Sequence, residues 1–267
     1  MGLWVFEARS RGMARHGQII TRSLLMGALL LLAGCTSMPP RLEEQAQALI
    51  ERVRDFDQLQ ETASFDPRRV ALVDRVGANL LFRGGMPVRE HRIAFDTWVG
   101  AMRAQAEAAG FSWPDRFRLI DISLMSRETE EANTELESDW FDDHEELGEF
   151  LHRPSFGVLV APNQVRDKIR TYMAARFDRW DQTPDQVAAI RAQLEIPADV
   201  PQILYVHCDT GVDRTGAMIG SYLMRYTGWS LDQVLAQNER LAGDDEVQPF
   251  TRNTLLWYAD HLKTRGM

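Results

Sequence analysis

A strand–loop–helix pattern over residues 202–226 constrains the fold more than any other part of this chain. The run Gln202-Ile203-Leu204-Tyr205-Val206 is apolar and β-prone, and residues 217–226 have the apolar spacing of a helix. Between the two runs lies His-Cys-Asp-Thr-Gly-Val-Asp-Arg-Thr-Gly, residues 207–216. The first N–H groups of a helix have no partner inside the helix and attract anions. The pattern therefore predicts an anion-binding loop beyond the carboxyl end of a strand.

Two side chains give this loop its chemistry. Cys208 precedes the predicted helix, and Arg214 follows it after five intervening residues. A helix N-terminus and a nearby guanidinium both favour thiolate over thiol. Arginine also binds two oxygens of an oxyanion through its planar fork. The pair indicates a nucleophilic thiol that attacks a bound phosphate-like group.

The pattern His-Cys-x-x-Gly-x-x-Arg-Thr-Gly resembles the signature loop of the protein tyrosine and dual-specificity phosphatase superfamily. The resemblance implies that Cys208 forms a phosphocysteine intermediate and that Thr215 eases departure of the thiolate. His207 would orient the loop and tune the thiolate, and a purely structural histidine fits equally well. The phosphate would be bound by the Arg214 side chain and by loop residues Asp209, Thr210, Gly211, Val212, Asp213 and Arg214.

Two further segments resemble the same superfamily. Residues 79–87 read as a strand and turn that contain Phe82-Arg83-Gly84-Gly85-Met86-Pro87. They match a Phe/Tyr-Arg-Ser-Gly-x-Pro segment, with Gly84 in place of serine. A predicted strand over 117–124 is followed by Arg127-Glu128, as in the family. The resemblance spans about residues 79–240 and is thin outside the loop.

The general acid is left open by the sequence. In most of the superfamily an aspartate on a separate loop protonates the leaving group. We expect that loop after a strand over 157–161, but Asn163 stands where the aspartate would be natural. Asp213 is the first candidate, because an aspartate at this position has been proposed as the acid in a similar bacterial subgroup with Asp-Arg-Thr-Gly. The alternatives are Asp167 and a residue of the acidic stretch 128–149, namely Asp139, Asp142 or Asp143.

Charge narrows the substrate class. The chain carries a net charge of −9, which argues against nucleic acid as a partner. The loop has no lysine, and Asp209, Asp213 and the acidic stretch would repel a polyanion. We therefore expect a phosphorylated protein, with phosphotyrosine or a dual-specificity site, or a small phosphomonoester. An inositol polyphosphate is the alternative substrate. The acidic stretch itself is interpreted as a solvated face or mobile flap, with a metal site or a dock for a basic partner as the alternative.

Two other functions fit parts of the pattern. A lipid-tethered pseudophosphatase would bind phosphate without turnover, as the missing acid-loop aspartate suggests. A sulfurtransferase would use the same thiol and anion cradle. Thr215-Gly216, Arg83 and Arg127-Glu128 favour the phosphatase. We expect no cofactor and no metal, since His91, His144, His152 and His261 show no ligand spacing.

The N-terminus reads as an export signal. A short apolar run, Ser23–Leu32, follows Arg15, His16 and Arg22 and is shorter than the roughly 20 residues that span a bilayer. Leu32-Ala33-Gly34-Cys35 resembles the bacterial lipobox, which implies a lipid on Cys35 and anchoring in the bacterial cell envelope, periplasmic or outer-membrane. An ordinary cleaved signal or an uncleaved anchor is the alternative. Met13 would give a more usual signal start.

The predicted organisation is a signal peptide over 1–34, a lipidated tether over 35–41 and a single domain over 42–267 with an acidic insertion at 128–149. Alternating strands and helices predict an α/β fold with a central, mostly parallel sheet flanked by helices. Cys35 and Cys208 are the only two cysteines, so no pair remains for a disulfide. Further helices are expected at 42–56, 90–109, 163–195 with a break near Thr183-Pro184, 230–241 and 251–263.

Overall fold

The computed structural model describes residues 65–127 and 129–267, which belong to one compact unit, Thr62–Met267. The predicted signal peptide, the tether with Cys35 and the helix over 42–56 lie outside the described residues and stay predictions. Within the described ranges, no helix combines the length and the apolar character needed to cross a membrane.

A five-stranded sheet forms the centre of the fold, in the order β1-β2-β7-β5-β6. Strands β2, β7, β5 and β6 run parallel, and β1 lies antiparallel to β2 at one edge. The strands are β1 (Ala71–Val76), β2 (Asn79–Gly85), β5 (Arg118–Ser123), β6 (Gly148–His152) and β7 (Gln202–Cys208), and a separate hairpin consists of β3 (Val88–Arg89) and β4 (Arg92–Ile93). The predicted mostly parallel α/β sheet is confirmed.

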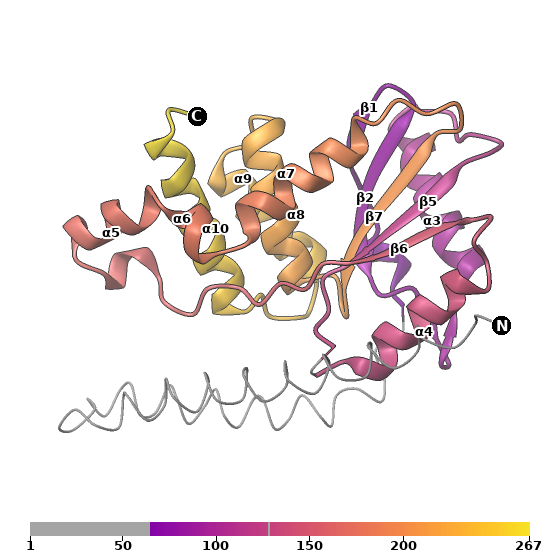
Figure 1. Cartoon of the computed structure of the whole chain (residues 1–267), viewed down its shortest axis with the longest axis horizontal. Coiled ribbons are helices and arrows are strands. Elements are labelled where there is room, and N and C mark those ends of the chain that lie inside the picture. Colours follow the sequence, from indigo (N-terminus) through magenta and orange to yellow (C-terminus); the bar gives the residue numbers. More distant parts are fainter. Residues whose placement is uncertain (1–64, 128) are drawn as a thin grey trace, which may run out of the picture. The chain divides into compact units, whose positions relative to one another are not determined.

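Helices cover both faces of the sheet (Figure 1). One face packs against α3 (Phe95–Ala108) and α4 (Glu131–Asp142). The other packs against α7 (Thr183–Leu194) and α8 (Asp213–Tyr226), with α9 (Leu231–Ala242) and α10 (Pro249–Thr264) behind them. The remaining elements are the one-turn helices η1 (Pro67–Arg69) and η2 (Pro162–Gln164), and the short helices α5 (Asp167–Ala174) and α6 (Phe177–Trp180), which pack on α10.

Strand alternation decides which way each residue of β7 points. Ile203 and Tyr205 are buried in the core on the α3 side. Leu204, Val206 and Cys208 are buried in the core on the α8 side. Because side chains alternate along a strand, His207 points to the α3 and α4 side and Cys208 to the α8 side.

The helix predicted over 90–109 begins later than expected. Residues 88–93 form the β3–β4 hairpin, with Glu90 and His91 at positive φ in its turn, and α3 begins only at Phe95. Polar residues at 89–92 carry no helical apolar stripe, so the hairpin turn takes precedence there.

The strand predicted over 157–161 is wrong; the strand next to β5 is β6, at 148–152. Gly157 has φ +73° and turns the chain away from the sheet. Side chains of α10 then hold the following backbone: Thr254 accepts from the Val158 N–H, and Trp257 donates to the Val160 carbonyl. The apolar residues of this run therefore lie along a helix rather than in the sheet.

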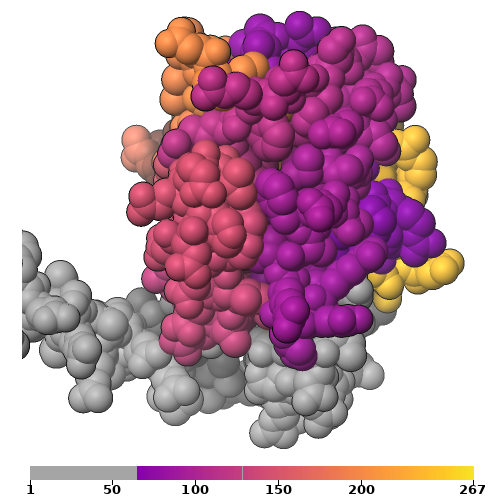
Figure 2. All heavy atoms as spheres, turned by 90° about the vertical axis from the view of Figure 1, so that its right-hand side faces the viewer, coloured from indigo at the N-terminus to yellow at the C-terminus, as the bar shows by residue number. Residues whose placement is uncertain are grey.

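The acidic stretch is partly structural. It contains α4, which lies beside α3 on the face shown in Figure 2. Most of its carboxyl groups are exposed, as a solvated face would be, but Glu130 is 3% and Glu137 0% exposed. The interpretation as a solvated face is therefore wrong for these two residues.

Candidate functional site

Cys208 is the last residue of β7 and is 2% exposed. After it the chain turns through a short loop into α8, which begins at Asp213. No side chain in the described part of the chain caps this helix at Val212. The N–H groups of its first turn have no partner inside the helix, so they could bind an anion beside the thiol.

The loop lies directly against the end of β2. Gly211 has φ +79°, and a Cβ there would approach the Gly84 carbonyl to 2.4 Å, so only glycine fits. The Met86 N–H also donates to the Asp209 carbonyl at 2.8 Å. The backbone of β2 thus fixes the curve of the loop from behind.

Gly84 replaces the serine of the family segment for a structural reason. A Cβ at Gly84 would lie 1.9 Å from the hydroxyl oxygen of Tyr205. That hydroxyl donates to the Gly85 carbonyl at 2.7 Å and is buried. Tyr205 therefore fills the space that a side chain at position 84 would need.

Arg83 clamps the loop from the sheet side. Its guanidinium, 1% exposed, donates to the Gly211 carbonyl at 2.8 Å and to Asn238 Oδ1 at 2.7 Å. The amide of Asn238 donates in turn to the Gly216 carbonyl at 3.1 Å. Burial lowers the pKa of Arg83 to about 10, which leaves it charged at neutral pH. One buried cation thereby joins β2, the loop and α9.

Arg214 is held by a carboxylate that the sequence analysis did not single out. Its two terminal nitrogens donate to the two oxygens of Glu130 at 2.5 and 2.6 Å. The Ser126 N–H donates to the same Glu130 carboxylate at 2.9 Å. Burial alone would lower the pKa of Arg214, but Glu130, Cys208 and Asp209 together outweigh it and raise the pKa. The guanidinium is fully charged and fixed in orientation.

His207 lies among buried carboxyl groups. Its Nδ1 is 3.3 Å from the Cys208 carbonyl, and its Nε2 is 3.1 Å from Asp121 Oδ1 and 3.2 Å from Glu137 Oε1. Burial lowers the pKa of His207, but Glu137 and Asp121 outweigh it and raise the pKa to about 10. Burial also raises the pKa of Glu137. The histidine before the thiol thus belongs to an ionisable cluster inside the fold.

Asp213 is bonded to the residues that begin α10. Its Oδ1 accepts from the Gln248 N–H at 2.7 Å and from the Thr251 hydroxyl at 2.9 Å. Burial raises its pKa in spite of these bonds. Burial likewise raises the pKa of Asp209, and Glu130 adds to the effect. Both carboxyl groups next to Arg214 therefore hold a proton more readily than an ordinary aspartate.

The remaining candidate residues differ in their solvent exposure: one is buried and the others are exposed. The Thr215 hydroxyl is buried and lies 3.5 Å from the Gly84 carbonyl, and Thr210 is exposed on the loop. The other candidate acids, Asp167, Asp139, Asp142 and Asp143, are all exposed. Of the aspartates considered as site residues, only Asp209 and Asp213 lie close to Cys208 and Arg214 in the chain.

The sequence did not predict three features of the site: Glu130, Asn238 and the role of Arg83. Glu130 stands two residues after the matched Glu128, inside a run of similar carboxylates. Nothing in that run distinguishes the buried residue from its exposed neighbours. Asn238 lies on α9 among other polar residues, and only the close approach of α9 to Gly216 reveals it.

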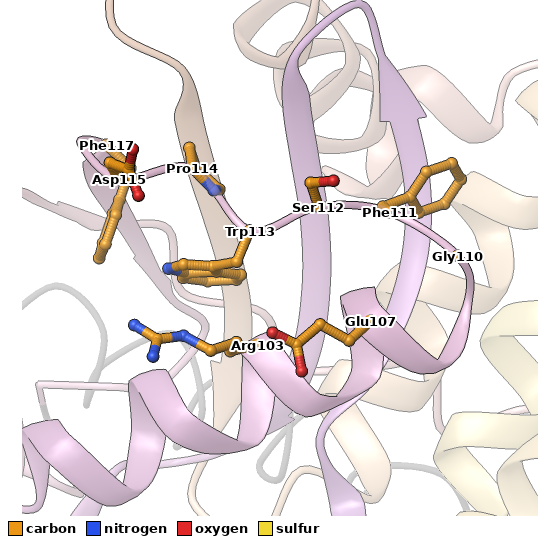
Figure 3. Close-up of a pocket in the computed structure, with 9 residues that line it drawn as sticks. All are labelled: Arg103, Glu107, Gly110, Phe111, Ser112, Trp113, Pro114, Asp115 and Phe117. Atoms are coloured by element: carbon orange, nitrogen blue, oxygen red, sulfur yellow. The ribbon is translucent and has the colours of Figure 1, made fainter.

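A cavity of about 610 Å³ lies elsewhere on the molecule (Figure 3). It is lined by the end of α3 and the segment that leads into β5, including Arg103, Glu107 and Trp113. Because β5 and β7 are parallel, the start of β5 is at the opposite end of the sheet from Cys208. This cavity therefore has no part in the thiol site.

No protein-family model and no curated protein sequence matches the chain. Solved structures resemble it: the core catalytic domain of the S. cerevisiae PP-IP phosphatase SIW14 in complex with citrate (15% identity, 76% of this chain and 92% of that chain, TM-score 0.41). PTPMT1 in complex with PI(5)P is also similar, with 13% identity over 73% of this chain and 98% of that chain and a TM-score of 0.37. Human DUSP28 is similar with 18% identity over 72% of this chain and 95% of that chain and a TM-score of 0.35. At such identities and TM-scores, these structures assign no function to this chain.

Proposed function

We propose that the chain is a cysteine-dependent phosphatase of the tyrosine or dual-specificity type. One observation carries the proposal: the only described cysteine ends a central strand, directly before a loop, an uncapped helix N-terminus and an arginine held by two bonds to Glu130. A buried structural cysteine needs none of these neighbours. Together they supply a nucleophile, an anion cradle and a fixed cation.

The reaction would run in two displacements. The Cys208 thiolate attacks phosphorus, the bond from phosphorus to the leaving oxygen breaks, and that oxygen takes a proton from the general acid. Water then attacks the phosphocysteine, gives a proton to the same carboxylate and releases phosphate and thiolate. Arg214 and the loop N–H groups hold the equatorial oxygens in both steps.

Asp213 remains our proposed general acid. It adjoins Arg214, and burial raises its pKa, so that it would hold a proton at higher pH than an ordinary aspartate does. Its Oδ1 already accepts one bond from Gln248, directly before α10, and one from Thr251 within it, which leaves Oδ2 for the proton.

A singly phosphorylated substrate suits the charges best. Residues 208–214 contain two aspartates and no lysine, and Glu130 already occupies the fork of Arg214 from one side. A phosphoprotein or a small phosphomonoester adds less negative charge here than an inositol polyphosphate does.

A non-catalytic phosphate-binding module is the second candidate. The observation that favours it is the engagement of Asp213 by Gln248 and Thr251, since a carboxylate used as a helix cap is held away from a leaving group.

Envelope anchoring through Cys35 is proposed for either function, and its test is metabolic labelling with a radioactive fatty acid, which Cys35→Ala should abolish.

The deciding experiment measures phosphate release from p-nitrophenyl phosphate by the wild type, Cys208→Ser and Arg214→Lys. Turnover by the wild type that is absent in Cys208→Ser supports the phosphatase. Tight phosphate binding by a folded wild type without turnover supports the binding module. Inositol hexakisphosphate and a phosphotyrosine peptide, compared at equal concentration, then rank the substrate classes.

A further inference from the structure

Three ionisable side chains from three elements converge beneath the catalytic loop. Asp121 comes from β5, Glu137 from α4 and His207 from β7, and each is 0% exposed. One ligand atom from each lies within 4.8 Å of the others. His207 Nε2 is 3.1 Å from Asp121 Oδ1 and 3.2 Å from Glu137 Oε1.

Strand register produces this convergence. Ser123 pairs with His207 across the parallel β5–β7 ladder, and Asp121 pairs with Tyr205. Because alternate residues share a face, Asp121, Ser123 and His207 all point towards α3 and α4. The buried side of α4 consists of Thr134, Glu137 and Phe141. Glu137 therefore lies next to the polar side chains of the two strands. A polar group built from four residues thus lies on an otherwise apolar face of the sheet.

The polar atoms of this group lack hydrogen-bond partners. Within the described part of the chain, six of its atoms remain unsatisfied: His207 Nε2, Ser123 Oγ and both carboxyl oxygens of Asp121 and of Glu137. The two short contacts of Nε2 have the length of ion pairs but lack the alignment of hydrogen bonds. Folded proteins rarely leave buried polar atoms unsatisfied, and one bound ion can satisfy several such atoms together.

A cation accounts for these atoms better than a shared proton does. One shared proton serves one pair of atoms, so the two protons that the raised pKa values of His207 and Glu137 favour still leave two of the six atoms unsatisfied. A divalent cation contacts a nitrogen and several oxygens at once and balances two carboxylates. Ligands of one cation also lie about 3 Å apart without pointing at each other, since the ion sits between them.

We propose that Asp121, Glu137 and His207, with the Ser123 hydroxyl beside them, form a buried site for one divalent cation. One imidazole and two carboxylates suit Zn²⁺, Mn²⁺ or Fe²⁺ better than Ca²⁺ or Mg²⁺. The ion would join α4 to the strand that ends in Cys208, and it would be taken up during folding because the site is closed. This site does not depend on the phosphatase proposal.

The test uses the full chain, unfolded with chelator and refolded with Zn²⁺, Mn²⁺ or Fe²⁺ in turn. Elemental analysis after desalting and the melting temperature are measured for the wild type, Glu137→Gln and Asp121→Asn. Asp139→Asn is the matched control, because it changes an exposed carboxylate on the same helix. We expect about one bound equivalent and a higher melting temperature for the wild type and the control. Both site variants should lose at least about nine-tenths of the bound metal.

Refolding the wild type with and without metal keeps the test decisive if a site variant fails to fold. A refolded wild type that retains none of the three ions and melts at the same temperature with or without them would overturn the proposal and favour a shared proton. So would metal retained equally by folded Glu137→Gln and Asp121→Asn, which would place the ion elsewhere. Because neither readout is enzymatic, a failure of the phosphatase proposal leaves this result unaffected.

Discussion

Glu130 binds both terminal nitrogens of Arg214, at 2.5 and 2.6 Å, from a position 84 residues earlier in the chain. Glu130 directly precedes α4, and Arg214 lies in the first turn of α8. The pair therefore connects the helix on one face of the sheet with the helix on the other, across the carboxyl ends of the strands. The cation that would hold the phosphate oxygens is aligned before any ligand arrives, which is how preorganised sites lower a barrier.

Replacement of Glu130 by glutamine tests whether Glu130 aligns Arg214. The amide has one acceptor oxygen in place of two and carries no charge, so the bidentate pair is lost and the guanidinium loses its fixed orientation. We expect kcat/KM for p-nitrophenyl phosphate to fall by about ten- to a hundredfold. The free energy of unfolding should fall by about 2 kcal/mol, since a charge-assisted bond is lost. Glu131→Gln, at the exposed neighbouring carboxylate, should change neither; equal effects in both variants would contradict the assignment.

Arg83→Lys tests the clamp behind the loop. A lysine keeps the charge but cannot reach both the Gly211 carbonyl and Asn238 Oδ1 in the fixed geometry of the guanidinium. We expect a loss of about 2 kcal/mol and a melting temperature lower by about 6 °C. Arg89→Lys, where the arginine donates to the Phe65 carbonyl outside the loop, is the control and should shift the melting temperature far less.

The local part of the site could be predicted from the sequence, because its determinants are neighbours in the chain. The apolar run into Cys208, the glycine at 211 and the helix after it specify β7, the loop and α8 without any knowledge of the rest. Ser230 likewise caps α9 as expected, with Gln233 completing the capping box.

The partners of the loop could not be predicted in this way. Glu130, Glu137 and Asp121 approach it only through the sheet order, which brings β5 beside β7 and places α4 over both. Asp121 and Ser123 did leave a signal, since polar residues alternate with Ile120 and Ile122 in a strand that is buried on both faces. The apolar run at 157–161 predicted a strand, but this segment is bonded to α10 and does not enter the sheet.

Gly84→Ser should be destabilising although serine is the residue of the similar family segment. Its Cβ would meet the Tyr205 hydroxyl at 1.9 Å and Cζ at 2.8 Å, so the ring has to move. We expect a loss of about 2 kcal/mol or more by chemical denaturation. Tyr205→Leu removes the obstruction. The double variant should therefore lose about 1 kcal/mol less stability than the sum of the losses in the two single variants. Strict additivity would show that the clash is relieved some other way.

Asp213→Asn should raise or preserve stability at neutral pH. Burial raises the pKa of Asp213 in the folded protein, so the protonated form is favoured by folding and the ionised form is disfavoured. The corresponding stability is present below the ordinary value of 3.8 and is lost as the pH rises through the folded pKa. Asparagine keeps an acceptor for the Gln248 N–H and Thr251 hydroxyl without that charge. Melting temperatures of variant and wild type should therefore converge only towards pH 3.8.

The same variant decides whether Asp213 is the general acid. If it protonates the leaving oxygen, Asp213→Asn should slow phenyl phosphate hydrolysis by about 10²- to 10⁴-fold and p-nitrophenyl phosphate much less, because nitrophenolate leaves without help. The fall in rate on the alkaline side of the pH profile should disappear. Thr251→Val is the control: it removes one bond to the same carboxylate but keeps its proton, so the alkaline limb should shift and persist. An alkaline limb unchanged in Asp213→Asn would leave Asp213 as a cap of α10 and direct the search to Asp209, whose carboxyl group is the other one in the loop with a raised pKa.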